Sequence, residues 1–493
     1  MSINFVDTTF RDGSQSLWAA GMRPGMMEAI AEDIANSGFS VVEVPVMPIN
    51  FKKIIRDLKE DPWEMVYMLA EKMPNVKKAF MGEPAIFPFE IIGAPTEVVK
   101  LFYKRIVETG VLNRVQIMAN IFGNVDELYP WYLPFLRSQG LEIALALSYT
   151  ISPRHTDEYY AKKTREIAKS KPDVIYLKDQ GGLLTVDRVR TLIPVILENA
   201  NGIPVEIHSH ITTGLAELVY LEALKLGVKT VHTGIPPLAD GSAQPSVLRF
   251  AKNAKYMGFE HNLDLERIQH VSDRLMEMAM EDNMPIGEPL GYDHSQYIYQ
   301  IPGGVISNLI HQLKELKLED RLEEVLEETV RVREELGYPV MITPYSQFVV
   351  SQAAINVATG ERYKVIIDEV IQFANGVFSE DSGYTWMDQN LKDKVLSSPR
   401  AKELSSSRQD DTSLDKIREQ FGGPGLSDEE FLLRYIMKGT KEIEEMRQAG
   451  PGKKYLSAST PVITLLSNLN KNPNIKTFHA VNGNSKIVLT SKE

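Results

Sequence analysis

The amino-acid sequence predicts an α/β fold, a (β/α)8 TIM barrel followed by a mainly helical C-terminal domain. Three observations lead to this prediction. Eight short apolar runs alternate with longer amphipathic runs over roughly the first 250 residues, the usual length of such a barrel. No glycine-rich dinucleotide-binding fingerprint follows the first run, which disfavours an open doubly wound sheet. After Leu248 the apolar spacing becomes helical.

The expected strands cover residues 3–8, 40–46, 76–81, 114–120, 141–148, 173–178, 204–210 and 229–233. Helical patterns lie between them, for example at residues 24–36, 95–108, 185–199 and 214–225. Gly38, Gly110 and Gly227 follow three of these patterns, where a residue with left-handed backbone commonly ends a helix. Strand, helix and glycine therefore repeat in the order that a barrel requires.

The rest of the chain is expected to be helical and to end in a short tail. Helices are predicted at residues 248–257, 263–282 and 312–336, a linker at 397–412 and a turn at 421–425. The tail has a β-like pattern but is too small to be a domain. We therefore expect a barrel domain at residues 1–290, a helical domain at 291–470 and a tail at 471–493.

Composition excludes several classes of function. The chain of 493 residues has a formal net charge of -12 and no basic run, so nucleic acid is not expected as the main partner. Cysteine is absent, which excludes disulfides, thiolate nucleophiles and zinc sites with cysteine ligands. The N-terminus has no signal-peptide pattern, and no apolar run is long enough to span a bilayer. We expect a cytoplasmic protein without membrane insertion.

Polar residues follow three of the expected strands, at the barrel end where such folds carry their chemistry. Asp12 follows the first strand, Lys178 ends the sixth, and His208 and His210 alternate on the seventh. Side chains two positions apart on a strand share a face, so the two imidazoles can bind one metal ion together with the carboxylate. The lysine cannot ligate a cation as an ammonium group. It neutralises an anion, pairs with Asp12 or Asp179, or carries a modification.

Six separated motifs occur along the chain in this order: DTTFRDGSQS, YLKDQGGLL, EIHSHITTG, TGIPPLADGSAQPSV, YIYQIPGGVISNL and ITPYSQFVVSQAAINVATGERYKVI. Together they resemble the carboxyltransferase subunit or domain shared by pyruvate carboxylase, the oxaloacetate decarboxylase alpha chain and the transcarboxylase 5S subunit. The resemblance runs from about residue 3 to 440 and implies a C-terminal carboxylase domain that completes the active-site funnel.

The resemblance also implies a set of metal ligands. In the family an aspartate, two histidines and a lysine carboxylated on its side chain hold a divalent metal, and these correspond here to Asp12, His208, His210 and Lys178. Carboxylation turns a cationic amine into an anionic oxygen ligand, which completes the site. Zinc, manganese and cobalt all accept such ligands, so the sequence does not distinguish them.

The implied reaction moves a carboxyl group between carboxybiotin and the methyl carbon of a 2-oxo acid, pyruvate or oxaloacetate in the family, through a metal-stabilised enolate. By the same resemblance, Arg11 and Gln15 face the 2-oxo acid. Thr343 would relay a proton between biotin N1 and the enolate, with Ser346 beside it. Each residue has a structural alternative, because Arg11 can pair with Asp12, Gln15 can begin a helix, and Thr343 can simply precede a proline in a turn.

Three segments of the expected substrate pocket depart from the family pattern. Residues 45–51 replace a Trp-Gly-Gly-Ala-Thr-Phe-Asp run, residues 81–89 replace Leu-Arg-Gly and a following tyrosine, and residues 118–120 replace a Phe-Asp pair. Met81 at the arginine position removes a charge-assisted contact worth roughly 2 to 3 kcal/mol. We expect Met81 to contact the substrate and the acceptor to be a different or larger 2-oxo acid, unless a neighbouring basic residue supplies the lost charge.

The expected partners are separate chains. Family members with a fused carrier have a biotinyl lysine within Met-Lys-Met, whereas Lys438 lies in a helical pattern and is expected to be an ordinary surface lysine. We therefore expect biotin on a separate carboxyl carrier protein, together with a biotin carboxylase or other carboxylase subunits. A homodimer is expected from the resemblance.

Two other functions stay open. A metal-dependent lyase or synthase of the hydroxymethylglutaryl-CoA lyase type shares the Arg-Asp-Gly-x-Gln and His-x-His patterns, but it does not account for Lys178-Asp179 or for residues 297–366. A non-catalytic scaffold would fit the altered pocket, but it would not need the four metal-site positions. The sequence does not give the direction of the reaction.

Overall fold

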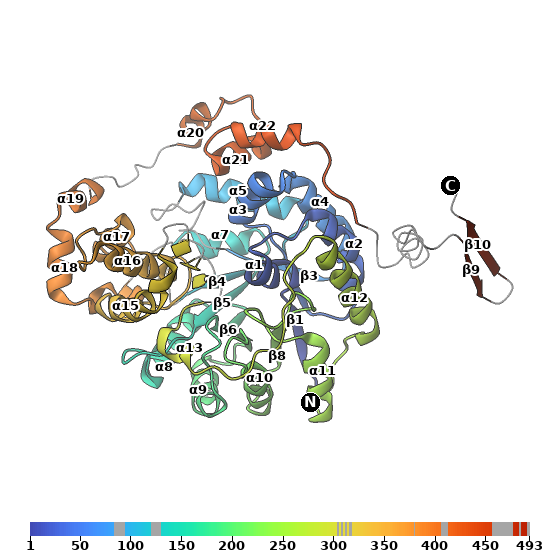
Figure 1. Ribbon diagram of the computed structural model, residues 1–493, viewed down its shortest axis with the longest axis horizontal. Coiled ribbons are helices and arrows are strands. Elements are labelled where there is room, and N and C mark those ends of the chain that lie inside the picture. Colours follow the sequence, from blue (N-terminus) through green and yellow to red (C-terminus); the bar gives the residue numbers. More distant parts are fainter. Residues whose placement is uncertain are drawn as a thin grey trace.

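A closed barrel of eight parallel strands, arranged in sequence order, forms the centre of the protein (Figure 1). The computed structural model describes residues 1–82, 94–119, 130–302, 305–306, 309–310, 313–314, 318–378, 380–405, 413–455, 477–482 and 485–490. All eight expected strands are present, so the predicted barrel is confirmed. They are β1 (Asn4–Asp7), β2 (Val41–Glu43), β3 (Lys77–Met81), β4 (Arg114–Met118), β5 (Glu142–Ser148), β6 (Val174–Asp179), β7 (Val205–Ser209) and β8 (Thr230–Thr233).

Helices surround the barrel on its outside (Figure 1). Gly38, Gly110 and Gly227 have φ angles of 89°, 79° and 110°, which confirms their expected places after helices. A π-helical turn (Thr9–Gly13) and α1 (Ser14–Trp18) follow β1 directly. The other barrel helices are α2 (Pro24–Ala35), α3 (Pro48–Lys53), α4 (Pro62–Lys72), α5 (Thr96–Glu108), α7 (Tyr132–Ser138), α8 (Asp157–Lys169), α9 (Val186–Asn199), α10 (Ala216–Lys225), α11 (Val247–Tyr256) and α12 (Leu265–Glu281), with a second π-helical turn at Ile54–Leu58.

Local sequence sets where several of these helices begin. The side chain of Thr156 accepts a hydrogen bond from the backbone N–H of Tyr159 at the start of α8, and Thr185 does the same for Arg188 at the start of α9. Such caps satisfy backbone donors that the first helical turn leaves unpaired. The strands before these helices are almost entirely buried, as expected for a parallel sheet that is covered on its outer face.

The helical region after the barrel contributes to two separate hydrophobic cores. Its first part includes α15 (Leu322–Glu335), α16 (Tyr345–Thr359) and α17 (Asp368–Ala374), whose apolar side chains form a core with Met81, Met118 and Tyr176 of the barrel strands. This packing holds the start of α16 against the carboxyl ends of β3 and β4. The smaller helices of this part are α13 (Ser295–Tyr299), α18 (Gln389–Leu396) and α19 (Pro399–Ser405), with 3-10 turns at Glu319–Arg321, Glu380–Ser382 and Tyr384–Trp386.

The second part packs on the outside of the barrel. It comprises α20 (Leu414–Gln420), α21 (Asp428–Met437) and α22 (Lys441–Gln448), whose buried side chains belong to the same core as the barrel helices. Lys438 directly follows α21 and is exposed, in agreement with its interpretation as a surface lysine. The tail forms an antiparallel hairpin of β9 (Thr477–Asn482) and β10 (Ser485–Thr490), so its predicted β character is confirmed.

Two sequence expectations in this region need correction. The helix expected at residues 312–336 begins only at Leu322 in its continuous part, after a 3-10 turn. The linker expected at residues 397–412 contains α19, because Pro399 suits a first helical turn and Ser398 accepts a hydrogen bond from the N–H of Ala401 (3.2 Å). Residues 406–412, 83–89 and 120, on which sequence expectations also fall, lie outside the described residues. Among the described helices, none is long and apolar enough to cross a bilayer.

Candidate metal and substrate site

Asp12, His208 and His210 meet at the carboxyl ends of β1 and β7, as the sequence predicts. The Nε2 atoms of His208 and His210 lie 3.2 and 3.6 Å from Oδ2 of Asp12. All three residues are buried, and one potential ligand atom of each lies within 4.8 Å of the others. Two imidazoles and one carboxylate at this spacing form a suitable three-residue site for a divalent cation.

The position of each histidine nitrogen is set by its neighbours. His210 Nδ1 lies 2.6 Å from the carbonyl oxygen of Ser242. A carbonyl can only accept, so this nitrogen carries a proton and Nε2 of a neutral His210 presents its lone pair towards Asp12. Burial lowers the pKa of His208 well below its usual value, so its imidazole is neutral at pH 7, the form that binds metals.

Asp12 is held as a carboxylate by the cation beside it. Burial opposes its ionisation, but the charge of Arg11 keeps the pKa of Asp12 well below its usual value. Arg11 Nη2 lies 3.0 Å from Asp12, and Arg11 Nε donates to Glu43 at 2.8 Å. The ion pair between Arg11 and Asp12, an alternative considered from the sequence, is therefore present, and it coexists with the convergence of the three ligands.

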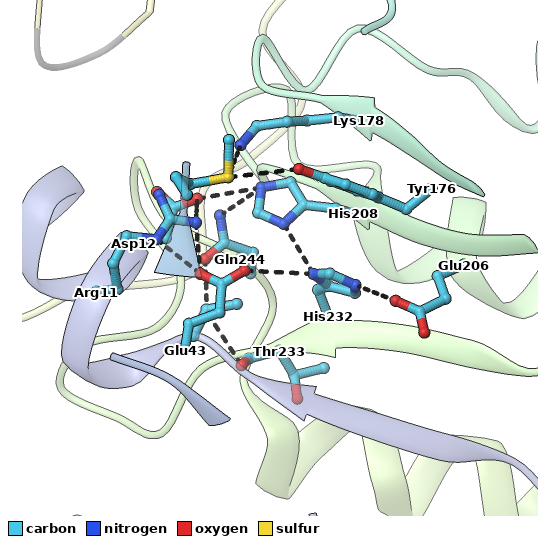
Figure 2. Close-up of polar contacts among 12 residues, drawn as sticks. Arg11, Asp12, Glu43, Tyr176, Lys178, Glu206, His208, His232, Thr233 and Gln244 are labelled. Atoms are coloured by element: carbon cyan, nitrogen blue, oxygen red, sulfur yellow. Dashed lines mark hydrogen bonds and ion pairs between the residues drawn. The ribbon is translucent and has the colours of Figure 1, made fainter. Parts of the chain in front are cut away.

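Lys178 lies next to His208 across the parallel ladder of β6 and β7. It is buried, and its Nζ approaches Sδ of Met81 at 3.8 Å. The following Asp179 has another role, because its carboxylate accepts hydrogen bonds from the N–H groups of Leu183 and Leu184 at 2.8 and 2.9 Å. Asp179 therefore fixes the loop after β6, while Lys178 points into the barrel (Figure 2).

A cavity of about 130 Å³ is lined by residues of both the barrel mouth and the helical region, although not by Asp12, His208 or His210 themselves. Five residues selected from the sequence line it: Arg11, Gln15, Met81, Lys178 and Thr343. Gln15 lies in the first turn of α1, as its structural alternative proposed, and still faces this cavity. Thr343 reaches the same space from the turn before α16, across more than 160 residues of sequence from Lys178. The barrel and the helical region thus share one site.

The rest of the cavity wall is mainly apolar and includes Met47, Ile49, Met118 and Ile342. All three segments that depart from the family pattern therefore contribute to this site, through residues 47–49, Met81 and Met118. Ser346 does not line the cavity. It is fully buried as the second residue of α16, and its Oγ has no hydrogen-bond partner among the described residues.

A buried polar network beneath the metal site was not identified from the sequence. Arg114 donates to both carboxylate oxygens of Glu206, at 3.0 and 2.7 Å, and Glu206 also contacts His232, which contacts His208 (Figure 2). Burial would raise the pKa of Glu206, but the charge of Arg114 and the contact with His232 lower it to about 2. The available signal was the alternation on β7, which places Glu206 on the same face as His208.

Asp7, at the end of β1, is expected to destabilise the protein above neutral pH. Its Oδ1 accepts from Thr9 Oγ1 at 2.6 Å, whereas its buried Oδ2 has no hydrogen-bond partner among the described residues. Burial raises the pKa of Asp7 from 3.8 to about 7. The folded state therefore favours the neutral acid. This contribution is fully present below pH 3.8 and is lost as pH rises towards 7.

The Asp7→Asn variant tests this expectation, because it removes the ionisation while keeping the shape. Its free energy of unfolding, relative to the parent protein, should increase by roughly 3 kcal/mol from pH 5 to pH 8. Urea denaturation at both pH values measures the difference. Asp187→Asn, on an exposed carboxylate of α9, serves as the control with no such change. A pH-independent difference for Asp7→Asn would contradict the raised pKa.

Two family models match the chain. Residues 2–275 match the model described as HMGL-like, and residues 297–476 match the model described as a conserved carboxylase domain. The first match covers the barrel and the second covers most of the helical region, so the two regions that share the cavity also correspond to two known domains.

Curated relatives cover most of the chain. A pyruvate carboxylase subunit from Methanocaldococcus jannaschii is 35% identical over 77% of this chain and 66% of its own length. The large subunit of 2-oxoglutarate carboxylase from Hydrogenobacter thermophilus is 30% identical over 91% of this chain and 69% of its own length. The match therefore spans slightly less than two thirds of the length of the Methanocaldococcus relative.

Solved structures agree with the fold. The carboxyl transferase domain of Rhizobium etli pyruvate carboxylase, in a structure with pyruvate, matches with a TM-score of 0.79 and 22% sequence identity. The match covers 100% of this chain and 84% of that one. At this level of identity the similarity establishes the architecture of barrel and helical region.

Proposed function

The chain belongs to the carboxyltransferase family of biotin-dependent carboxylases, and from this premise we propose that it transfers a carboxyl group between carboxybiotin and a 2-oxo acid. The observation that carries the proposal is the shared cavity, in which Thr343 of the helical region meets Lys178 and Arg11 of the barrel. A lyase of the hydroxymethylglutaryl-CoA type needs only the barrel ligands. The convergence of both regions therefore favours carboxyl transfer.

A divalent metal fits the residues at the barrel mouth. Asp12, His208 and His210 would hold it, because their oxygen and nitrogen atoms converge and Nδ1 of His210 already donates to a backbone carbonyl, which leaves Nε2 for the metal. Lys178, carboxylated on Nζ, would supply the fourth ligand. The metal, zinc, manganese or cobalt, would supply positive charge beside the oxygen of a developing enolate.

The other site residues have roles that follow from their chemistry. Arg11 and Gln15 would orient the 2-oxo acid through its oxygens. The Thr343 hydroxyl would accept a proton from the methyl or methylene carbon of the acceptor and pass its own proton to biotin N1, so that no free carbanion meets water. Ser346, inside α16, is proposed to support substrate binding from behind Thr343.

The acceptor is proposed to be larger than pyruvate or less dependent on a cation. Met47, Ile49, Met81, Met118 and Ile342 make the wall opposite the metal site apolar. A hydrocarbon portion of a longer 2-oxo acid would displace water from such a wall, a gain of about 0.8 kcal/mol for each buried methylene group. Met81 is the residue of this wall that also approaches Lys178.

The carboxyl donor is proposed to arrive on a partner. Lys438 lacks the Met-Lys-Met context of a biotinyl lysine, and a carrier protein is proposed to bring biotin to the site. A biotin carboxylase subunit would load that carrier. Affinity purification of the native complex, followed by detection of biotinylated chains, measures this association, and the absence of any biotinylated partner would contradict it.

A carboxyl-transfer assay with free carboxybiotin tests the function and the acceptor together. The purified chain should transfer carboxyl to 2-oxo acids, with kcat/KM at least about tenfold higher for a longer acceptor than for pyruvate. Met81→Arg should reverse this order by restoring a cation. Cleavage of a 3-hydroxyacyl-CoA without carboxyl transfer would support the lyase instead, and pyruvate as clearly the best acceptor would contradict the larger-substrate proposal.

A further inference from the structure

The two histidines of the metal site differ in what fixes their ring protons. Nδ1 of His210 donates to a backbone carbonyl, whereas Nδ1 of His208 faces Nδ1 of His232 at 3.2 Å. Two imidazole nitrogens at this distance share a single proton, so one donates and the other accepts. The direction of this one hydrogen bond decides whether Nε2 of His208 has a lone pair.

Glu206 and Arg114 decide that direction. Arg114 donates to both oxygens of Glu206, at 3.0 and 2.7 Å, and this bidentate contact holds the group as a carboxylate, which can only accept. His232 Nε2 lies 3.0 Å from the same carboxylate and must therefore carry the proton. With its ring proton directed to Glu206, His232 presents Nδ1 as an acceptor, and Glu43 Oε1, 3.8 Å from that nitrogen, lies beyond hydrogen-bond distance.

His208 must then donate from Nδ1 and present a lone pair at Nε2. A second contact agrees with this conclusion, because the amide nitrogen of Gln244, which can only donate, lies 3.3 Å from His208 Nε2. The Nε2 atom lies 3.2 Å from Oδ2 of Asp12. Two lone-pair groups face each other there, an arrangement that a cation between them stabilises (Figure 2).

We propose that Arg114, Glu206 and His232 are positioning residues that hold His208 in the tautomer able to bind the metal. The proposal rests on the metal site of the proposed function. These three residues form a buried chain of hydrogen bonds in the barrel interior, with Arg114 on β4, Glu206 on β7 and His232 on β8. Each member is at most 6% exposed, so water does not compete for these hydrogen bonds.

The same residues do not form a second metal site. Glu43, His208 and His232 lie close enough to suggest one. However, Arg11 donates to Oε2 of Glu43 through Nε at 2.8 Å and through Nη2, so a guanidinium cation already neutralises that carboxylate, whose other oxygen lies 3.8 Å from His232 Nδ1. His232 directs its proton to Glu206. The network is therefore suited to orient a ligand and not to provide a further set.

Metal affinity, measured without any assay of activity, tests the proposal. Zinc titrations of the metal-free chain against a chromophoric chelator should show about a 10- to 100-fold weaker affinity for His232→Phe than for the parent protein. His232→Asn keeps a carbonyl that can accept from His208 Nδ1 and should recover most of the affinity. The absorption spectrum of bound cobalt should differ clearly from that of the parent protein in His232→Phe and only slightly in His232→Asn.

A matched control variant and the parent protein show whether the positioning proposal or the metal site itself is wrong. His261→Phe makes the same exchange at a histidine that packs on Phe5, away from the site, and should bind zinc normally. If His232→Phe binds zinc as tightly as the parent, the positioning role is wrong. If both His232 variants are equally weak, the role is steric and the tautomer proposal is also wrong. If the parent chain binds no zinc, cobalt or manganese, the metal site of the proposed function fails first.

Discussion

Replacement of Lys178 by alanine is expected to lower carboxyl transfer by about a thousandfold or more while the fold persists. The side chain is buried next to His208 and lines the shared cavity. Loss of a metal ligand or of the charge beside the reacting oxygen removes transition-state stabilisation that typically contributes about 10²- to 10³-fold for one group and more for a metal. Transfer rates with free carboxybiotin measure the loss of activity, and circular dichroism of the variant shows whether the fold persists.

The Lys178→Arg variant tests whether Lys178 acts as a carboxylated lysine or as a simple cation. Arginine keeps the positive charge but cannot form the lysine carbamate, so it should be as inactive as alanine and should bind metal more weakly. Intact mass in bicarbonate buffer should show one added CO2 on the parent protein and none on Lys178→Arg. Lys78→Ala, at a buried lysine of β3 that donates to backbone carbonyls, is the control. Full activity of Lys178→Arg would contradict the carbamate.

Replacement of Thr343 by alanine is expected to slow carboxyl transfer by about 10²- to 10⁴-fold, the usual contribution of a proton-transfer group. Thr343 lines the cavity from the turn before α16, and under the proposed function its hydroxyl would reach both biotin and the acceptor. Thr343→Ser keeps the hydroxyl and should retain most of the activity. Single-turnover rates with carboxybiotin and proton exchange at the acceptor methyl carbon measure the effect.

Metal content distinguishes the loss of carboxyl transfer in Thr343→Ala from the loss in Lys178→Ala. Thr343→Ala should bind zinc as the parent does, because Thr343 does not contact Asp12, His208 or His210 in the described contacts, whereas Lys178→Ala should bind it more weakly. Thr359→Ala, at the opposite end of α16, controls for damage to the helix. Unchanged proton exchange in Thr343→Ala would show that another group moves the proton.

Much of the barrel could be predicted from local pattern. Continuous apolar runs and capping glycines depend on neighbours in sequence, and Gly38, Gly110 and Gly227 end helices as expected. The candidate metal ligands His208 and His210 were also accessible, because their spacing alone places them on one face of β7. The predicted start of the helix that ends at Glu335 was wrong, because charged residues at helical spacing do not mark where a helix begins.

Other features depended on contacts between distant residues. Nothing in the alternation of β7 says that Glu206 is ionised, because Arg114 that pairs with it comes from β4 and His232 from β8. The burial of Ser346 away from the cavity was equally inaccessible, since its position depends on how α16 packs against the core around Tyr176.

The sequence by itself determined the eight strands, the place of the polar residues at their carboxyl ends and the spacing that puts His208 and His210 on one face of β7, because period, spacing and residue chemistry are local properties. Only the tertiary structure decided that Thr343 shares a cavity with Lys178 and that a chain of buried groups from Arg114 to His208 fixes a ring proton. Both facts arise from packing and desolvation, which bring together side chains more than 90 residues apart and make each hydrogen bond between them directional.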